Sequence, residues 1–339
     1  MRSPGVLPAE IQDALLTSHG LITSAACREL GLSHDRVERM VRNEALTVLA
    51  RGVYGAGSAV SALPPWPRFA LRSKAFILAS PVGAVAADWS AVALHRLPVV
   101  SPPPAVPSVI RQGSRGSGSN RTCHGRTRFA AVEDRWISCV DDTRAVLPAI
   151  AAVDLFRTCD PLTALVLADA VAARDGSNGM LMRAWEDMRR WPGINRSRWA
   201  IERCDPNAQT ALESAGRLAF IRAGLPVPAS NVWVGESGPR YRLDHYWARE
   251  RLAAEGDGIS KYLIDGDPAR ALQQEKDREW WLHSKGIRTI RYTWKLAVGS
   301  PDELAKRCRS LLTEPALPTD GELQFWTARE GAEILGLHR

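Results

Sequence analysis

The sequence has few cysteines and no long apolar run, and both absences restrict the class of protein. Its six cysteines fall at no spacing typical of a zinc site, and we expect them to be reduced thiols. No stretch approaches the roughly 20 apolar residues that cross a bilayer, and the first residues lack the apolar core of a secretion signal. We therefore expect a cytoplasmic protein with no membrane partner.

Acidic residues are outnumbered, with 37 Asp and Glu against 44 Lys and Arg, which gives a net charge of +7. This balance is compatible with DNA as a partner, although an arginine-rich protein without such a partner fits equally well. Apolar residues make up 45% and charged residues 24% of the chain, which is typical of a globular protein. A length of 339 residues predicts two or three domains.

The pattern of elements predicts a multidomain α/β protein. Its parts are a winged helix-turn-helix at 1–57, a mostly helical middle region at 58–204, an α/β domain with a mixed sheet at 205–312, and a tail at 313–339. The tail either adds one more helix or stays loosely attached. The sequence leaves the oligomeric state open.

Residues 8–57 predict three short helices followed by a β-hairpin. Thr23 or Ser24 is suited to cap the second helix and Ser33 the third, which runs from residue 34 to about 45. The hairpin spans 46–56 around Arg51 and Gly52. This order is typical of a winged helix-turn-helix.

The third helix carries the residues expected to read DNA. Arg36, Arg39 and Asn43 follow helical spacing, arginine pairs with guanine edges and asparagine with adenine edges, and Arg51 at the wing tip is placed to reach a phosphate. Residues 1–57 nevertheless hold six arginines and six acids, so this unit has no net charge. A protein-interaction module is therefore the alternative.

The middle region predicts helices at 68–79, 85–94, 143–157, 161–173 and 181–191. No acidic residue occurs between Asp88 and Glu133, where there are six arginines: Arg96, Arg111, Arg115, Arg121, Arg126 and Arg128. This stretch either binds the phosphate backbone of a nucleic acid or is a mobile surface loop.

Residues 205–312 predict the order helix, strand, strand, strand, helix, strand, helix. If 248–251 form a turn, paired residues on the second and third strands have numbers that sum to 499, which places Asp244 opposite Glu255. Asp257 lies two residues further along and shares that face. Opposed like charges destabilise a sheet, and a divalent cation held by carboxylate oxygens compensates for them. Such a cation activates water and neutralises a scissile phosphate.

Glu213 on the preceding helix is a plausible fourth acid, and Gly216 one turn later allows that helix to approach the sheet closely. The alternative is structural. The same register sets Arg242 against Asp257 in a salt-bridge network, and a slip of one residue sends the acids to opposite faces.

Residues 206–312 resemble the family related to very-short-patch-repair endonucleases, a branch of the PD-(D/E)xK restriction-endonuclease-like superfamily. The matching segments are ALESAGRLAFIRAGLP with Glu213, RLDHYW with Asp244, EGDG with Glu255 and Asp257, QEKDREWW, and KGIRTIRYTW. The resemblance implies that Asp244 and Glu255 ligate Mg²⁺ or Mn²⁺, with Glu213 and Asp257 assisting. The superfamily lysine two residues after the second acid is replaced by Asp257, so Lys261 would supply that charge from a shifted position. Gly256 also replaces the usual apolar residue between the acids.

Residues 21–57 resemble the N-terminal winged helix of AbiEi-family antitoxins. The shared pattern is helix, Gly-Leu-Ser, helix, and then a hydrophobic residue followed by Arg-Gly-Val-Tyr; segments 83–98 and 142–157 resemble later helices of that family. The resemblance implies a toxin–antitoxin or phage-defence context, with a cognate toxin or defence protein as partner. Two hypotheses follow: a metal-dependent DNA endonuclease directed by its winged helix, or a non-catalytic DNA-binding antitoxin or repressor with a degenerate nuclease domain.

Overall fold

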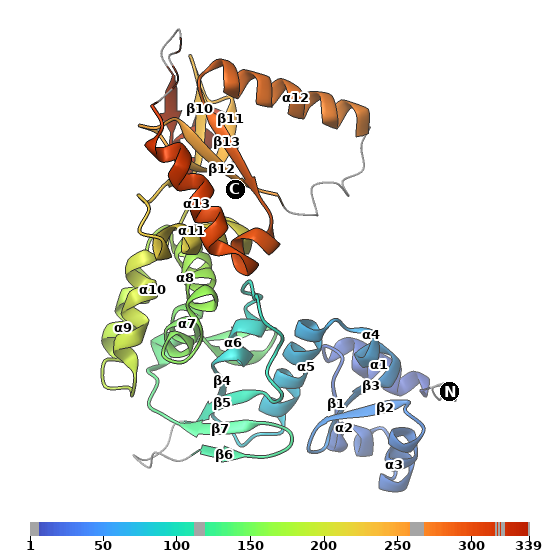
Figure 1. The fold of residues 1–339 in the computed structure, drawn as a ribbon. Coiled ribbons are helices and arrows are strands. Elements are labelled where there is room, and N and C mark those ends of the chain that lie inside the picture. Colours follow the sequence, from blue (N-terminus) through green and yellow to red (C-terminus); the bar gives the residue numbers. More distant parts are fainter. Residues whose placement is uncertain are drawn as a thin grey trace. The chain divides into compact units, whose positions relative to one another are not determined.

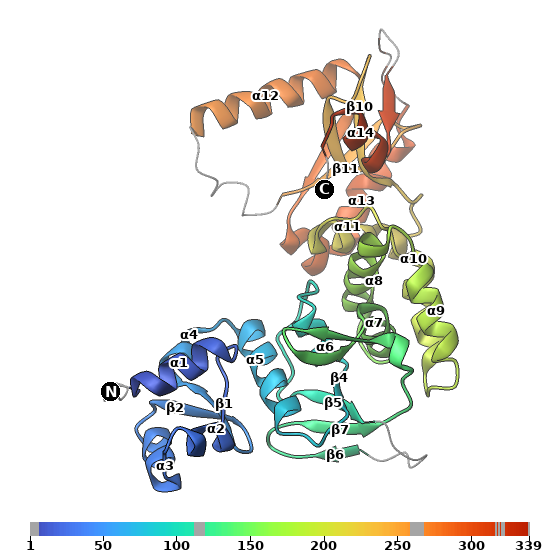
Figure 2. The same cartoon turned by 180° about the vertical axis from the view of Figure 1, so that it is seen from behind.

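The computed structural model describes residues 7–111, 119–257, 268–315, 317, 319 and 323–337. The chain is mixed α/β and divides into two compact units (Figures 1 and 2). The N-terminal unit comprises 1–97, 101–158 and 184–197, and the C-terminal unit comprises 98–100, 159–183 and 198–339. Among the described residues, none of the helices combines the length and apolar character needed to span a membrane.

The N-terminal unit begins with three helices and a hairpin, as the sequence predicts. These are α1 (Ala9–Thr17), α2 (Ser24–Glu29), α3 (His34–Arg42), β2 (Leu46–Ala50) and β3 (Val53–Ala56). The short strand β1 (Ile22–Thr23) completes a sheet of order β1-β3-β2. Thr23 and Ser33 are the helix caps, since their hydroxyls accept hydrogen bonds from the backbone N–H groups of Ala26 and Arg36.

Burial explains why this segment folds in this way. Ile11, Cys27, Val37 and Leu46 meet in one apolar cluster, to which each helix and the hairpin contribute. A second cluster joins the hairpin to α5 (Pro65–Leu78), which follows α4 (Gly57–Ala62). Each apolar side chain buried in this way contributes about 1.5–3 kcal/mol, so the helices are held by packing more than by intrinsic propensity.

The rest of the N-terminal unit contains a six-stranded mixed sheet of order β6-β7-β5-β4-β9-β8. Its strands are β4 (Ala84–Ala86), β5 (Ser108–Arg111), β6 (Ser119–Arg121), β7 (Arg126–Phe129), β8 (Ile137–Val140) and β9 (Thr143–Val146). Two helices accompany it, α6 (Trp89–Leu94) and α7 (Pro148–Phe156).

Two predicted helices therefore begin too early. Residues 85–94 form β4 and then α6, and residues 143–157 form β9 and then α7. An apolar run of three or four residues has the same pattern in a buried strand and in the first turn of a helix. The actual boundaries are set by Asp88, whose φ is 56°, and by Pro148, which occupies the first turn of α7.

The predicted order of elements between 205 and 312 is present in the C-terminal unit. The elements are α11 (Ala211–Arg222), β10 (Ala229–Gly235), β11 (Tyr241–Trp247), β12 (Leu252–Gly256), α12 (Pro268–Ser284), β13 (Arg288–Tyr292) and α13 (Pro301–Thr313). Before them in the chain come α8 (Pro161–Asp175), α9 (Gly179–Asp187) and α10 (Ser197–Arg203), and residues 184–187 of α9 belong to the N-terminal unit. The tail adds an edge strand, β14 (Gln324–Trp326), and the helix α14 (Ala328–Ile334).

The C-terminal sheet has the order β13-β12-β11-β10-β14, in which β12 and β13 are parallel and the other pairs antiparallel. One face packs on α12 through Trp281 and Leu282. The other face packs on α11 and α13, with Phe220 and Leu304 in its core. Helices thus cover both faces of this sheet, as Figure 1 shows.

Candidate functional site

The predicted turn between β11 and β12 is confirmed, and so is the predicted register for the three residue pairs next to that turn. Residues 248–251 form the turn, and His245, Tyr246 and Trp247 pair with Ala254, Ala253 and Leu252, so each pair of numbers sums to 499. The backbone pairing ends there.

Beyond that point Asp244 bonds to β12 through its side chain, because its Oδ2 accepts a hydrogen bond from Gly256 N at 2.8 Å. The regular pairing of β11 with β12 therefore stops at Asp244. The carboxylate of Asp244 is held by the backbone of Gly256, the residue that follows Glu255.

Glu213 lies buried in the first turn of α11. Its carboxylate accepts hydrogen bonds from Gln209 N at 2.8 Å, from the Thr210 hydroxyl at 2.9 Å and from the Asn231 side-chain amide. Burial raises the pKa of Glu213, and the negative charge of Asp244 raises it further. Glu213 and Asp244 therefore interact electrostatically. The carboxylate of Glu213, however, already accepts hydrogen bonds from three donors.

Tyr292 of β13 is buried within the electrostatic influence of three predicted acids. Burial raises its pKa well above the ordinary value, and the charges of Asp244, Glu213 and Glu255 add to that effect. Its hydroxyl lies 2.8 Å from His245 Nε2.

His245 is fully buried, and burial, aided by the charge of Arg217, lowers its pKa to about 3. It is thus a neutral packing residue, consistent with its place on the opposite face from Glu255. Gly216 explains the close approach of α11, since a β-carbon there would lie 2.5 Å from the Tyr292 hydroxyl oxygen.

Glu255 is buried in β12 and is neutralised by an arginine. Arg278 on α12 donates to its Oε1 at 2.8 Å, and the exposed fractions of the two side chains are 17% and 3%. The same guanidinium donates to the backbone oxygen of Arg242 at 3.0 Å. This arginine supplies the positive charge that the sequence suggested a metal would provide.

Asp257 is likewise paired with an arginine, but not with the expected one. Its Oδ1 lies 3.3 Å from Arg291 Nη1, and Arg291 also binds Glu275 and Glu279. Arg242, predicted to face Asp257, instead stacks over Trp233. Asp257 pairs with Arg291 because β13 lies parallel to β12. This pairing places Arg291 beside Glu255 and within reach of Asp257.

The residues as arranged do not fit a bound divalent cation. Among the described residues, no three His, Cys, Asp or Glu side chains are placed to hold one. Arginines pair with Glu255 and Asp257, and Glu213 is engaged by backbone and side-chain donors. Lys261, the candidate for the shifted lysine, lies outside the described residues.

The residues predicted to read DNA are mostly exposed in the N-terminal unit. Arg36 and Arg39 project from α3, and neither forms an ion pair with a described residue. Arg51 is exposed in the turn between β2 and β3, as expected for a wing tip.

Asn43 departs from its expected role. It is exposed but caps the end of α3, and either orientation of its side-chain amide bonds to local backbone. It therefore stabilises the helix end, and reading an adenine would require those hydrogen bonds to break.

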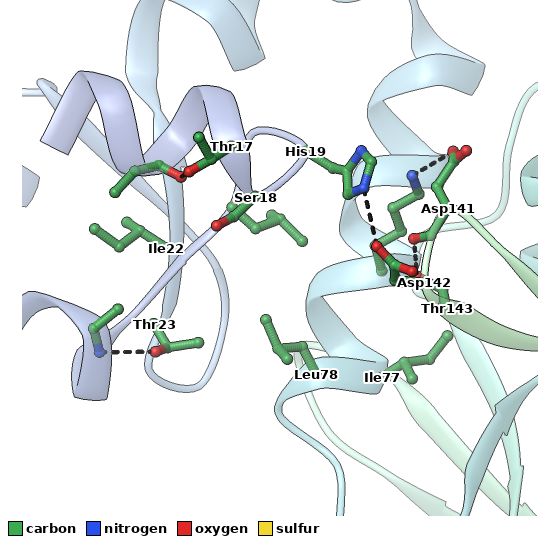
Figure 3. A pocket seen from close by; sticks show the side chains of 14 residues that line it. Thr17, Ser18, His19, Ile22, Thr23, Ile77, Leu78, Asp141, Asp142 and Thr143 are labelled. Atoms are coloured by element: carbon green, nitrogen blue, oxygen red, sulfur yellow. Dashed lines mark hydrogen bonds and ion pairs between the residues drawn. The ribbon is translucent and has the colours of Figure 1, made fainter.

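A pocket of about 440 Å³ in the N-terminal unit lies between the end of α1 and α5. Figure 3 shows His19 directed toward Asp142, while Ile22, Ile77 and Leu78 form an apolar side. His19 Nε2 lies 3.3 Å from Asp142 Oδ2. Lys74 donates to Asp141 at 2.7 Å, so the charged groups that line this pocket are already partnered.

Sequence reasoning missed the counter-ions Arg278 and Arg291 and the central Tyr292. All three stand in segments that carry the nuclease resemblance, QEKDREWW and KGIRTIRYTW. The spacing of Glu275 and Arg278 on one helix was the available signal, but nothing in the sequence shows which acid of a neighbouring strand an arginine will reach.

Comparison with known proteins identifies two uncharacterized relatives. Over 139 residues the chain is 31% identical to two proteins of Mycobacterium tuberculosis, the uncharacterized proteins MT2308 and Rv2248. The match covers 40% of this chain and 49% of each relative, so the chain spans about half the length of the curated relatives it matches. No protein-family profile matches the chain.

Proposed function

We propose that this protein binds double-stranded DNA through α3 and the β2–β3 hairpin of its N-terminal unit. The observation that carries the proposal is the exposed pair Arg36 and Arg39, which have no acidic partner among the described residues. Arg39 Nε lies 3.4 Å from the backbone oxygen of Asp35, and arginines without an acidic partner can bond to guanine edges or phosphates. By contrast, Arg42 on the same helix is engaged by Glu38 at 3.5 Å.

The surrounding topology supports this proposal. A helix that follows a tight turn enters the major groove in helix-turn-helix proteins, and a hairpin after it contacts the flanking backbone. Here the turn at Gly31–Ser33 separates α2 from α3, and Arg51 marks the hairpin tip. The resemblance to AbiEi antitoxins favours a regulatory role for such binding, with a toxin or defence protein as partner.

The proposal is tested by fluorescence anisotropy with a labelled duplex pool of random sequence. We expect Arg36→Ala with Arg39→Ala to weaken binding at least about tenfold, because each base or phosphate contact contributes about 1–3 kcal/mol. Arg42→Ala is the matched control, an exposed arginine on the same helix that already has a partner, and it should change affinity less than about twofold. Equal losses in the two proteins would contradict the proposal.

Metal-dependent hydrolysis of DNA by the C-terminal unit is the second candidate function. It is favoured by the hydrogen bond from Gly256 N to Asp244, which holds this carboxylate against the strand that carries Glu255. The expected Mg²⁺ or Mn²⁺ does not fit the residues as they are arranged, because Glu255 and Asp257 are paired with Arg278 and Arg291. The arrangement described above would have to open first, with Arg278 leaving Glu255.

The two functions are separated by incubating supercoiled plasmid with the protein and Mg²⁺ or Mn²⁺. Nicking that is lost in both Asp244→Asn and Glu255→Gln would support the hydrolase. Binding of DNA without added metal and without nicking would support DNA binding as the function and would contradict the hydrolase.

A further inference from the structure

The N-terminal unit has a second cluster of positive charge on the β6–β7 hairpin. Arg121 and Arg126 pair directly across this hairpin, and both side chains are exposed. Like charges directly opposite each other destabilise an antiparallel pair unless an anion lies between or beside them. Neither arginine forms an ion pair within the part of the chain that the structure describes.

These two arginines differ from the others of the acid-free stretch. Arg128 on the same strand is turned inward and bonds to the buried carboxylate of Asp154. Arg111 lies over the ring of Phe129. Arg115 is outside the described residues, and Arg96 lies near the acidic turn that contains Asp141.

Arg121 and Arg126 also line a pocket of about 220 Å³, together with Asp88, Trp89, Pro104, Ala105, Val106 and Ser108. This volume is below the 300–1,000 Å³ typical of whole small-molecule ligands. It suits one charged group of a larger molecule.

Asp88 is the one acid of this pocket, and its backbone is strained. Its φ of 56° and ψ of −140° lie in a region that residues other than glycine rarely adopt, and such strain is concentrated at functional sites. Its Oδ1 accepts from Trp89 N at 2.6 Å, and no described residue forms an ion pair with it, although the positive charges of Arg128 and Arg126 act on its carboxyl. Two arginines against one aspartate leave one positive charge, which matches a single phosphodiester.

We propose that Arg121 and Arg126 form a second DNA contact, which binds one backbone phosphate of the nucleic acid. This inference rests on the proposed DNA-binding function and names a contact separate from α3. It assigns no base readout to the pocket, since a phosphate contact adds affinity without sequence preference.

The test is the salt dependence of duplex binding by the full chain. Removing one phosphate contact lowers the slope of log K against log salt by about 0.9. We expect this change in Arg121→Ala and in Arg126→Ala, and no change in Arg144→Ala, an exposed arginine of the same sheet. Removal of one of two opposed charges should also leave the melting temperature unchanged or higher.

Asp88→Asn is a variant for which the expected change in duplex affinity is opposite to that of the arginine variants. It keeps the side-chain acceptor for Trp89 N and removes the negative charge, so duplex affinity should rise. A structural role for these residues would not produce opposite changes in affinity at Asp88 and Arg126. Unchanged slopes in both arginine variants, with a lowered slope in Arg36→Ala, would overturn this inference and leave the proposed function intact.

If the wild-type chain does not bind duplex DNA, the proposed function fails and the phosphate site is judged separately. Inorganic phosphate is then titrated while the guanidinium resonances are followed by NMR. A saturable shift that is lost in Arg126→Ala would support a site for a phosphate group that does not belong to duplex DNA. Absence of any such shift would overturn the proposed phosphate site.

Discussion

The hydroxyl oxygen of Tyr292 lies 2.5 Å from the point where Gly216 would carry a β-carbon. This close approach joins β13 to α11, the helix that carries the buried Glu213. The absence of a side chain at position 216 therefore sets how closely the helix with Glu213 approaches β13.

The first prediction concerns this contact. Gly216→Ala should destabilise the C-terminal unit by about 1–3 kcal/mol, because the added methyl group would clash with the side chain of Tyr292. Tyr292→Phe in the same chain should recover part of the loss. Native-state hydrogen exchange at the amides of β11 and β12 measures this free energy, and a stabilised Gly216→Ala variant would contradict the described packing.

The second prediction concerns the ion pair between Arg278 and Glu255. Arg278→Met should destabilise the C-terminal unit by about 3–5 kcal/mol, because a buried carboxylate loses its partner. Adding Glu255→Gln should restore most of that stability. If Arg278→Met alone is neutral in chemical denaturation, the pair is not formed in solution.

The third prediction concerns pH and His245. Its pKa of about 3 in the folded protein is below the ordinary value of 6.5, so between those pH values the unfolded chain binds one more proton. Its share of the stability is therefore complete above pH 6.5 and falls as pH drops, by about 1.4 kcal/mol per pH unit. His245→Phe should flatten the profile by this amount over that window.

Asp88 and Asp169, whose pKa values are raised to about 6, give slopes of the opposite sign. For this reason the difference between wild type and variant is the quantity to compare. Identical profiles would show that His245 titrates normally in the folded protein.

The fourth prediction tests whether Arg278 occupies the place of a cation. In Arg278→Ala, added Mn²⁺ should raise the melting temperature, because Glu255 loses its ion pair with Arg278 next to Asp244. The wild-type protein should show a smaller shift, and Arg278→Ala with Asp244→Asn should show none. Equal shifts in all three proteins would place the metal elsewhere.

The sequence predicted the C-terminal elements closely because their signals are local and agree with one another. The turn at 248–251 fixes the register of β11 and β12, and Gly286 ends α12 where a left-handed residue is needed. Caps were equally readable, since Thr23 and Ser33 act within three residues of themselves.

The arginine partners of the acids were not predictable in the same way. Arg278 is 23 residues from Glu255, and Arg291 is 34 residues from Asp257. The Arg291 contact depends on the parallel pairing of β12 with β13, and the Arg278 contact depends on the packing of α12 against the sheet. Local pattern specifies neither. The six-stranded sheet was missed for a related reason, because strands of three or four residues such as β4 and β9 resemble helix starts.

Hydrogen–deuterium exchange of the full chain with and without duplex shows whether α3 and the β2–β3 turn contact DNA. We expect slower exchange at residues 34–43 and 50–53 when duplex is added, and no such change in the variant that lacks Arg36 and Arg39. Protection confined to the C-terminal unit, with exchange at 34–43 unaltered under saturating duplex, would contradict this contact.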